Sequence, residues 1–142
     1  MMKILCPLRG GPESEETIAY AVAMAEKEEA PLGFLYVVNL DLIPSSSISR
    51  AKSIADELSR MGEFILLMAQ AQAAVAGVSA DLFVRRGNIP EQILIACQEM
   101  RVETLIMGRS RTENGESFFD KKSQDEFIRN LKEKCETRVI QV

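Results

Sequence analysis

The sequence predicts an α/β protein built on one open, parallel, five-stranded sheet with helices on both faces. Five apolar runs of strand length alternate with four segments of helical periodicity. Three of these runs are almost continuously apolar, which is typical of parallel strands covered on both faces. No low-complexity linker divides the 142 residues, so we expect a single domain over residues 1–142.

The predicted strands are short segments separated by charged or turn-forming residues. They cover residues 3–8, 32–38, 78–85, 102–108 and 137–142. The first, second and fourth are the nearly continuous apolar runs, and we therefore expect them in the centre of the sheet. Because a helical pattern separates each strand from the next, the strands should be parallel and joined by right-handed crossovers.

The first helix is predicted soon after the first strand. Ile18, Ala21, Val22 and Ala25 recur at spacings of three and four, which places them on one side of a helix. Ser14 precedes this pattern at a position suited to an N-cap, because its hydroxyl can accept a hydrogen bond from the first helical turn.

The second helix is predicted to be the longest, with the serines at 45–47 marking its entry. Its apolar stripe consists of Ile48, Ala51, Ile54, Ala55, Leu58, Met61, Ile65, Met68 and Ala69. We expect Met61 and Met68 to be core residues rather than part of a cofactor pocket, because methionine in such a stripe usually fills the core.

The third helix has the clearest start signal. Asn88 is its predicted N-cap, Pro90 lies in the first turn, and Glu91 stands where a capping box has its acid. A weaker fourth helix carries the apolar residues Phe127, Ile128 and Leu131.

Composition excludes several classes of function. The absence of histidine removes the commonest general base, the commonest zinc ligand and every Ser-His or Cys-His nucleophile. The net charge of -4 argues against general nucleic-acid binding.

No apolar run reaches the roughly 20 residues of a membrane helix, and no signal peptide is visible, so we expect a cytoplasmic protein. The widely spaced Cys6, Cys97 and Cys135 are expected to be small buried apolar residues.

Candidate ligand contacts follow from the predicted sheet. Open parallel sheets bind ligands at the carboxyl ends of their strands, where the strand order reverses. The residues that follow the strands are Arg9, Gly10 and Gly11 after the first, Asn39 and Asp41 after the second, Arg86 and Gly87 after the third, and Gly108, Arg109, Ser110 and Arg111 after the fourth.

Four segments, in order and at the right spacing, resemble the universal stress protein family. The clearest is GNIPEQILIACQEMRVETLIMGRSR at residues 87–111, which is similar to the family's third helix, fourth strand and glycine loop. The segment KILCPLRGGPESEETIAYAVAMA at 3–25 resembles the family's opening strand and helix without a gap. GFLYVV at 33–38 and TRVIQV at 137–142 stand where the family has its second and closing strands.

The resemblance implies a Rossmann-like sheet in the order 3-2-1-4-5, similar to that of the adenine nucleotide alpha-hydrolase group. It also implies a non-catalytic homodimer that acts in stress response or regulation and pairs through its last strand. The residues expected at this interface are Arg138, Val139, Ile140, Gln141 and Val142. A second copy would satisfy the unpaired backbone groups of an edge strand. The alternative is that the last strand is an unpaired edge of the sheet, and that the charge of Arg138 keeps other strands from pairing with it.

The sequence departs from the nucleotide-binding branch of the family. That branch carries an aspartate after the first strand and a Gly-x2-Gly-x9-Gly-Ser/Thr loop after the fourth, whose backbone approaches the phosphates. Arg9 stands in place of the aspartate, and Arg111 replaces the second glycine after Gly108. Lys121 and Lys122 occupy the final pair. These departures argue against standard ATP binding, while the strand ends remain the expected site for ATP or another adenine nucleotide.

A second hypothesis assigns an anion to a rim of arginines, formed by Arg9, Arg86, Arg109 and Arg111 with Arg85 beside them. A guanidinium presents a planar fork that suits phosphate and carboxylate. The alternative is that these arginines are solvated or paired with acids, for which the candidates are Asp41, Glu113 and Glu116. For a nucleotide or an anion, the predicted site consists of Pro7, Leu8, Arg9, Gly10, Val38, Gly87, Met107, Gly108, Arg109 and Arg111. No metal site is expected.

Two further interpretations concern the loops. Residues 109–126 are polar apart from Phe118 and Phe119, and we expect them to cover the strand ends as a mobile flap or with the phenylalanines tucked in. The third functional alternative is a nucleotide-using enzyme of the alpha-hydrolase group. The short chain and its first loop, LRGGPES, argue against that alternative, because the loop lacks the S-G-G-x-D pattern of a pyrophosphate site.

Overall fold

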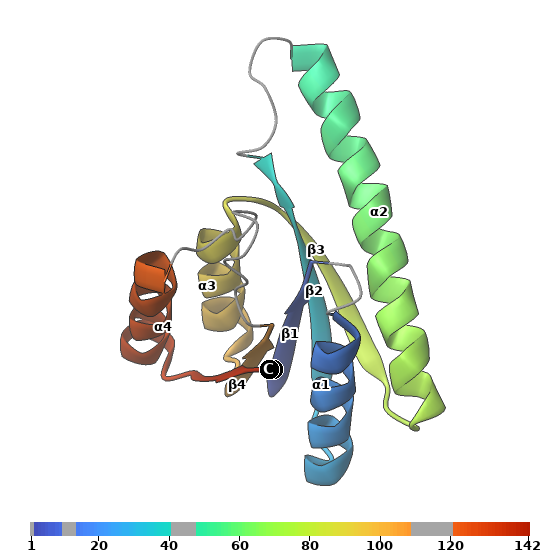
Figure 1. Cartoon of the computed structure of the whole chain (residues 1–142), viewed down its shortest axis with the longest axis vertical. Coiled ribbons are helices and arrows are strands. Elements are labelled where there is room, and N and C mark those ends of the chain that lie inside the picture. The colour runs from blue at the N-terminus through green and yellow to red at the C-terminus, as the bar shows by residue number, and fades with distance from the viewer. Residues whose placement is uncertain (1, 10–13, 41–47, 109–120) are drawn as a thin grey trace.

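The computed structural model describes residues 2–9, 14–40, 48–108 and 121–142. Within these residues, strands and helices alternate along the chain (Figure 1). The strands are β1 (Ile4–Leu8), β2 (Leu32–Asn39), β3 (Ala80–Gly87), β4 (Thr104–Met107) and β5 (Arg138–Gln141). The helices are α1 (Ser14–Glu28), α2 (Ile48–Val75), α3 (Ile89–Met100) and α4 (Lys121–Cys135).

The strands form one parallel sheet in the order β3-β2-β1-β4-β5, which confirms the predicted fold class and strand order. β1, β2 and β4 are the inner strands, and nearly all of their residues are buried. Their continuous apolar sequences follow from this position, because helices cover both of their faces. β3 and β5 are the edges of the sheet and are correspondingly more exposed.

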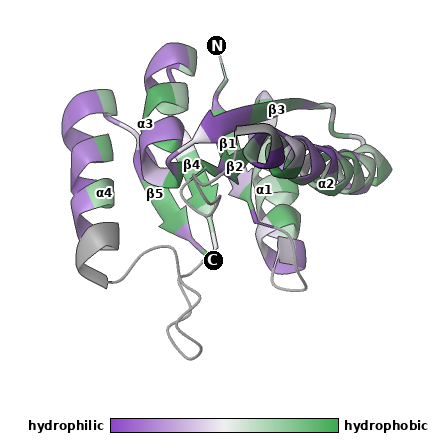
Figure 2. Ribbon diagram, turned by 90° about the horizontal axis from the view of Figure 1, so that it is seen from above, coloured by the Kyte–Doolittle hydropathy of each residue, from purple (hydrophilic) through white to green (hydrophobic). Residues whose placement is uncertain are grey.

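Two hydrophobic layers hold the helices against the sheet. α1 and α2 cover one face, while α3 and α4 cover the other (Figures 1 and 2). Successive strand residues point to opposite faces. Cys6 therefore belongs to the same layer as Leu66 of α2, whereas the preceding Leu5 belongs to the layer of Phe127 and Leu131 of α4.

The prediction that Met61 and Met68 belong to the core is wrong, since their side chains are 56% and 53% exposed. α2 packs against the sheet through a face that shares Ala55 and Ala69 with the predicted stripe but consists mostly of small residues: Ala55, Ser59, Gly62, Leu66, Ala69 and Ala73. Gly62 shows why small residues are needed, because a Cβ atom there would lie 2.2 Å from the ring of Tyr36 on β2. The helix approaches β2 so closely that larger apolar residues are left on its outer side.

The start of α3 has the predicted N-cap. Asn88 has extended backbone angles, and its side-chain oxygen accepts a hydrogen bond from the backbone N–H of Glu91 at 3.1 Å. Pro90 lies in the first turn, where its missing N–H leaves no hydrogen bond unmade. This cap fixes α3 directly after the end of β3, so the β3–α3 connection is short and well defined.

Candidate functional site

The order of the sheet reverses between β1 and β4, and this is the point at which open α/β sheets bind ligands. β1 pairs with β4 only at Ile4 and Leu5, whereas its pairing with β2 continues to Leu8. Two residues beyond the last β1–β4 pair, Pro7 has no backbone N–H to extend the ladder. The carboxyl ends of β1 and β4 are therefore not hydrogen-bonded to each other, and we call this place the switch point.

The described residues of the predicted site have different surroundings. Leu8 and Met107 are almost fully buried, and Val38 is completely buried, so these three are enclosed by protein. Pro7 and Gly108 are partly exposed, while Arg9 is exposed and has no ion-pair partner within the described part of the chain. Gly10, Arg109 and Arg111 lie outside the described residues, as do the predicted acidic partners Asp41, Glu113 and Glu116 and the loop phenylalanines Phe118 and Phe119.

Thr17 is a residue at the switch point that the sequence analysis did not select. It lies in the first part of α1 and is 4% exposed. A Cβ atom on Gly108 would lie 3.4 Å from its hydroxyl oxygen, so the end of β4 reaches the start of α1. The only sequence signal for Thr17 is its place one turn into the predicted helix. A hydroxyl here provides a hydrogen-bonding group beside the partly exposed Gly108.

Charge at the start of α1 is mixed. The backbone N–H groups of a helix N-terminus favour an anion. However, Glu15 and Glu16 occupy the first turn of α1, and both are exposed. Their carboxylates offset part of this attraction, so Arg9 is the described group that most favours an anion at the switch point.

The proposed rim of arginines does not form as expected at β3. Arg86 donates to the Asp56 carboxylate of α2 at 3.1 Å, and Arg85 donates to Glu99 of α3 at 2.6 Å. Because adjacent strand residues point to opposite faces, these two guanidinium groups lie on opposite sides of the sheet. Both arginines tie β3 to its covering helices, through acids that the sequence analysis did not name.

Gly87 shapes the connection from β3 to α3. Its φ is +146°, a conformation that residues with a side chain rarely adopt. A Cβ atom there would also lie 2.8 Å from the side-chain amide nitrogen of Gln92. Glycine at this position is therefore explained by the turn and its close packing, before any ligand is considered.

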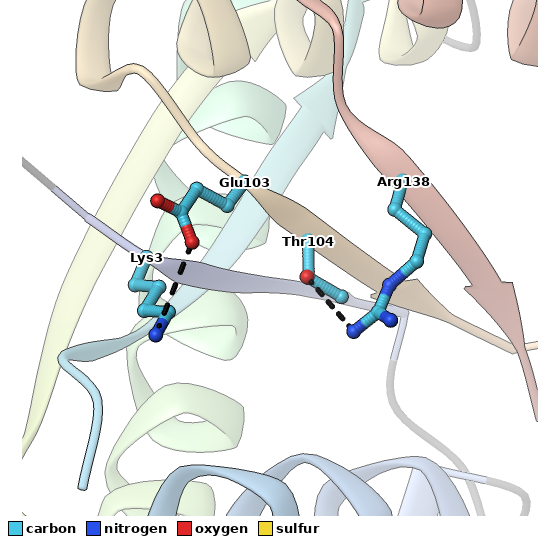
Figure 3. Close-up of polar contacts among 4 residues, drawn as sticks. All are labelled: Lys3, Glu103, Thr104 and Arg138. Carbon is cyan, nitrogen blue, oxygen red and sulfur yellow. Dashed lines mark hydrogen bonds and ion pairs between the residues drawn. The ribbon is translucent and has the colours of Figure 1, made fainter. Parts of the chain in front are cut away.

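The β5 edge is anchored by polar contacts at its amino end. Arg138 donates to the Thr104 hydroxyl of β4 at 3.4 Å, while a separate ion pair at 4.0 Å joins Lys3, just before β1, to Glu103, just before β4 (Figure 3). The backbone N–H groups of Arg138 and Val142 donate to carbonyls of the segment containing β4.

Strand alternation gives the direction of the remaining N–H groups of β5. Since Arg138 and Val142 donate inwards, the N–H groups of Val139 and Gln141 are directed outwards. Val139 and Ile140 are each only partly buried, although they pack against the core on opposite faces of the sheet.

The cysteine side chains carry thiols, with no disulfide. Burial raises the pKa of Cys6 far above its ordinary value. Burial, together with the nearby Cys135 thiol, raises the pKa of Cys97 to about 12.

The described residues contain no cluster of three potential metal ligands among their cysteine and acidic side chains. Nor does any helix in the described ranges have the length and apolar character to cross a membrane.

One curated relative has detectable sequence similarity over most of its length. This is the universal stress protein YxiE of Bacillus subtilis, which is 26% identical over 114 residues. The alignment covers 75% of this chain and 77% of the relative.

Solved structures with the same fold include the universal stress protein UspA from Lactobacillus plantarum. It superposes with a TM-score of 0.79 at 14% identity, over 99% of this chain and 97% of that one. The Archaeoglobus fulgidus universal stress protein in complex with dAMP has a TM-score of 0.61 at 15% identity, covering 99% and 97% of the two chains. An Arabidopsis thaliana family protein with AMP bound has a TM-score of 0.60 at 12% identity, covering 100% and 91%.

The family model gives the identification. Residues 1–132 match the model described as "Universal stress protein family". This match includes the switch point, the capped start of α3 and most of α4. The chain therefore belongs to the universal stress protein family.

Proposed function

We propose that this protein is a non-catalytic universal stress protein that acts in the cytoplasm, in stress response or regulation, as a homodimer paired through β5. The observation that carries the proposal is the family match over residues 1–132. The described groups nearest the switch point are apolar side chains, the Arg9 guanidinium and the Thr17 hydroxyl. These groups can bind a molecule, and the carboxylates beside them, Glu15 and Glu16, are exposed to solvent rather than held against a nucleophile.

The β5 edge supports the dimer. Val139 and Gln141 direct their N–H groups away from β4, and a second copy of β5 would provide acceptors for them. The partly buried Val139 and Ile140 would lose further apolar surface on the two faces of a continuous sheet. A twofold axis beside β5 would give both copies the same contacts.

Replacement of Gln141 by proline tests the dimer. Gln141→Pro removes one outward N–H and leaves the inward hydrogen bonds of β5 in place. We expect the dimer dissociation constant to rise at least about 30-fold, because each of the two copies loses one interface hydrogen bond and each loss costs about 1–3 kcal/mol. Gln141→Ala retains the N–H and is the matched control. Light scattering over a dilution series gives both constants. Equal constants for the two variants, at unchanged circular dichroism, would reject β5 as the interface.

A second candidate function is binding of an adenosine monophosphate at the switch point. AMP and dAMP are the ligands named for two of the similar structures. A monophosphate needs fewer backbone contacts than a triphosphate, so it depends less on the second loop glycine that Arg111 replaces. The exposed Arg9 can pair with one phosphate, and Thr17 offers a hydroxyl nearby.

Calorimetric titration with AMP and ATP tests this second candidate. We expect AMP to bind more tightly than ATP, and Arg9→Ala to weaken AMP binding about tenfold, as for a charge-assisted hydrogen bond. Arg60→Ala is the control, since Arg60 is an exposed arginine of α2. Equal affinity of the two arginine variants would remove Arg9 from the site, and no heat with either nucleotide would reject the nucleotide candidate.

A further inference from the structure

We propose that Cys97 and Cys135 are a redox pair, which forms a reversible intramolecular disulfide when the protein meets a hydroperoxide. Cys97 lies on α3 and Cys135 is the last residue of α4, so the bond would join the two helices on one face of the sheet. This inference is independent of the dimer and of any nucleotide.

Cys135 contacts α3 one turn before Cys97. The sulfur of Cys135 lies 4.0 Å from the backbone oxygen of Leu94. Leu94 precedes Cys97 by one helical turn, and helix side chains lean towards the helix N-terminus, over that preceding turn. Both cysteines also belong to the same hydrophobic cluster, to which Cys97 contributes a fully buried side chain and Cys135 a partly buried one.

One backbone hydrogen bond and one side-chain hydrogen bond connect the segments that carry the two cysteines. The Cys97 carbonyl accepts from the N–H of Val102 at 3.1 Å. The Val102 carbonyl in turn accepts from the Thr137 hydroxyl at 2.8 Å, and Thr137 stands two residues after Cys135. Thr137 is 1% exposed, so these bonds are shielded from water. The end of α3 and the junction of α4 with β5 are therefore fixed to each other.

The pKa values of the two thiols also indicate that they are neighbours. The Cys135 thiol adds to the effect of burial on the pKa of Cys97. Burial raises the pKa of Cys135 as well, and the neighbouring Lys134 opposes that rise. Cys135 is the more exposed of the two and is therefore the thiol that a hydroperoxide would reach first.

The reaction balances with one hydroperoxide. The Cys135 thiolate attacks the terminal oxygen, the O–O bond breaks, and the products are a sulfenic acid on Cys135 and an alcohol, or water from hydrogen peroxide. The Cys97 sulfur then attacks the Cys135 sulfur, forming the S–S bond and breaking the S–O bond. The departing hydroxide takes the Cys97 proton and leaves as water. The two thiols lose two electrons and two protons, and the hydroperoxide accepts both.

The disulfide would clamp α4 and the start of β5 to α3. It would close a loop that runs from Cys97 through β4 and α4 to Cys135. Closing a loop of this length restricts the unfolded chain, so the oxidised protein should have a midpoint of thermal unfolding about 5–10 °C higher. Cys6 has no part in this reaction, because it lies on the opposite face of the sheet.

The test treats the native full-length protein with hydrogen peroxide, blocks free thiols with N-ethylmaleimide under denaturing conditions, and digests with trypsin without reduction. Trypsin places Cys97 in the peptide 87–101, Cys135 in 135–138 and Cys6 in 4–9. We expect peptides 87–101 and 135–138 joined by a disulfide that a reductant cleaves, while Cys6 is alkylated. A scanning calorimetry run of the oxidised protein should show the higher unfolding midpoint.

Variants separate the proposed pair from general oxidation. Cys97→Ala or Cys135→Ser should abolish the linked peptides and the thermal shift, whereas Cys6→Ala should retain both. The wild-type digest decides the question even if a variant does not fold, provided that the mass of the undigested protein under denaturing, non-reducing conditions shows single chains, because a link between two chains would double that mass. Three alkylated thiols after peroxide, a Cys135 sulfinic acid beside a reduced Cys97, or a Cys135 link between two chains would each overturn the proposal. An unchanged unfolding midpoint of the linked form would overturn the clamp.

Discussion

Arg85 and Arg86 are consecutive in the sequence but bind acids on opposite sides of the sheet. Arg85 pairs with Glu99 of α3 and Arg86 with Asp56 of α2. The alternation of strand side chains could have predicted the two directions, but the partners are set by helix packing that no local pattern reveals. Because these pairs are substantially exposed, each contributes at most about 1 kcal/mol to stability. Because Arg85 and Arg86 pair with these acids, Arg9 is the arginine of the predicted anion rim that has no ion-pair partner among the described residues.

The thiols allow a prediction for individual residues. Under native conditions we expect iodoacetamide to alkylate Cys135 first, and Cys6 and Cys97 only when the protein unfolds. Burial raises the pKa of each thiol, and Cys135 is the most exposed of them. Since the thiolate is the reactive form, the rate at Cys135 should increase about tenfold per pH unit below its pKa. Mass spectrometry of timed samples measures the order, and alkylation of Cys6 as fast as Cys135 would contradict the buried position of β1.

Among the elements, α2 shows where apolar periodicity misleads. The large residues Met61 and Met68 suggested one buried face, but the helix packs through small residues such as Gly62 and Ala73. Hydrophobicity gives little weight to alanine, serine and glycine, although these residues allow the closest approach of helix and strand. The strands were more predictable, because burial on both faces makes a central strand continuously apolar. The N-cap at Asn88 was also predictable, because it depends only on neighbouring residues.

Gly62 gives a prediction for the packing of α2. Gly62→Ala should destabilise the protein by about 1–3 kcal/mol, although alanine is the better helix former, because the new methyl group would overlap the Tyr36 ring. Ser53→Ala, at an exposed position of the same helix, is the control and should change stability by less than about 0.5 kcal/mol. Urea denaturation measures both. A stabilised Gly62→Ala variant would show that α2 does not pack this closely on β2.

For the whole molecule, the strand order followed from the family resemblance, and its inner strands could also be read from their composition. The switch point between β1 and β4 follows from that order. The detailed geometry of the switch point does not follow from the strand order, because the approach of Gly108 to Thr17 depends on how α1 packs against the end of β4. The sequence also shows which family features are replaced, by Arg9 and Arg111, but a ligand suited to these replacements depends on their arrangement in space.

The most direct test of the proposed function is native mass spectrometry of the protein purified from an expression host, followed by denaturation to release any bound small molecule. We predict a complex with the mass of two chains, because the outward N–H groups of β5 can pair with a second copy of the chain. We also predict that no ATP is retained, because Arg9 and Arg111 replace parts of the standard ATP site. Single chains at micromolar concentration, or a dimer that releases ATP, would contradict this account.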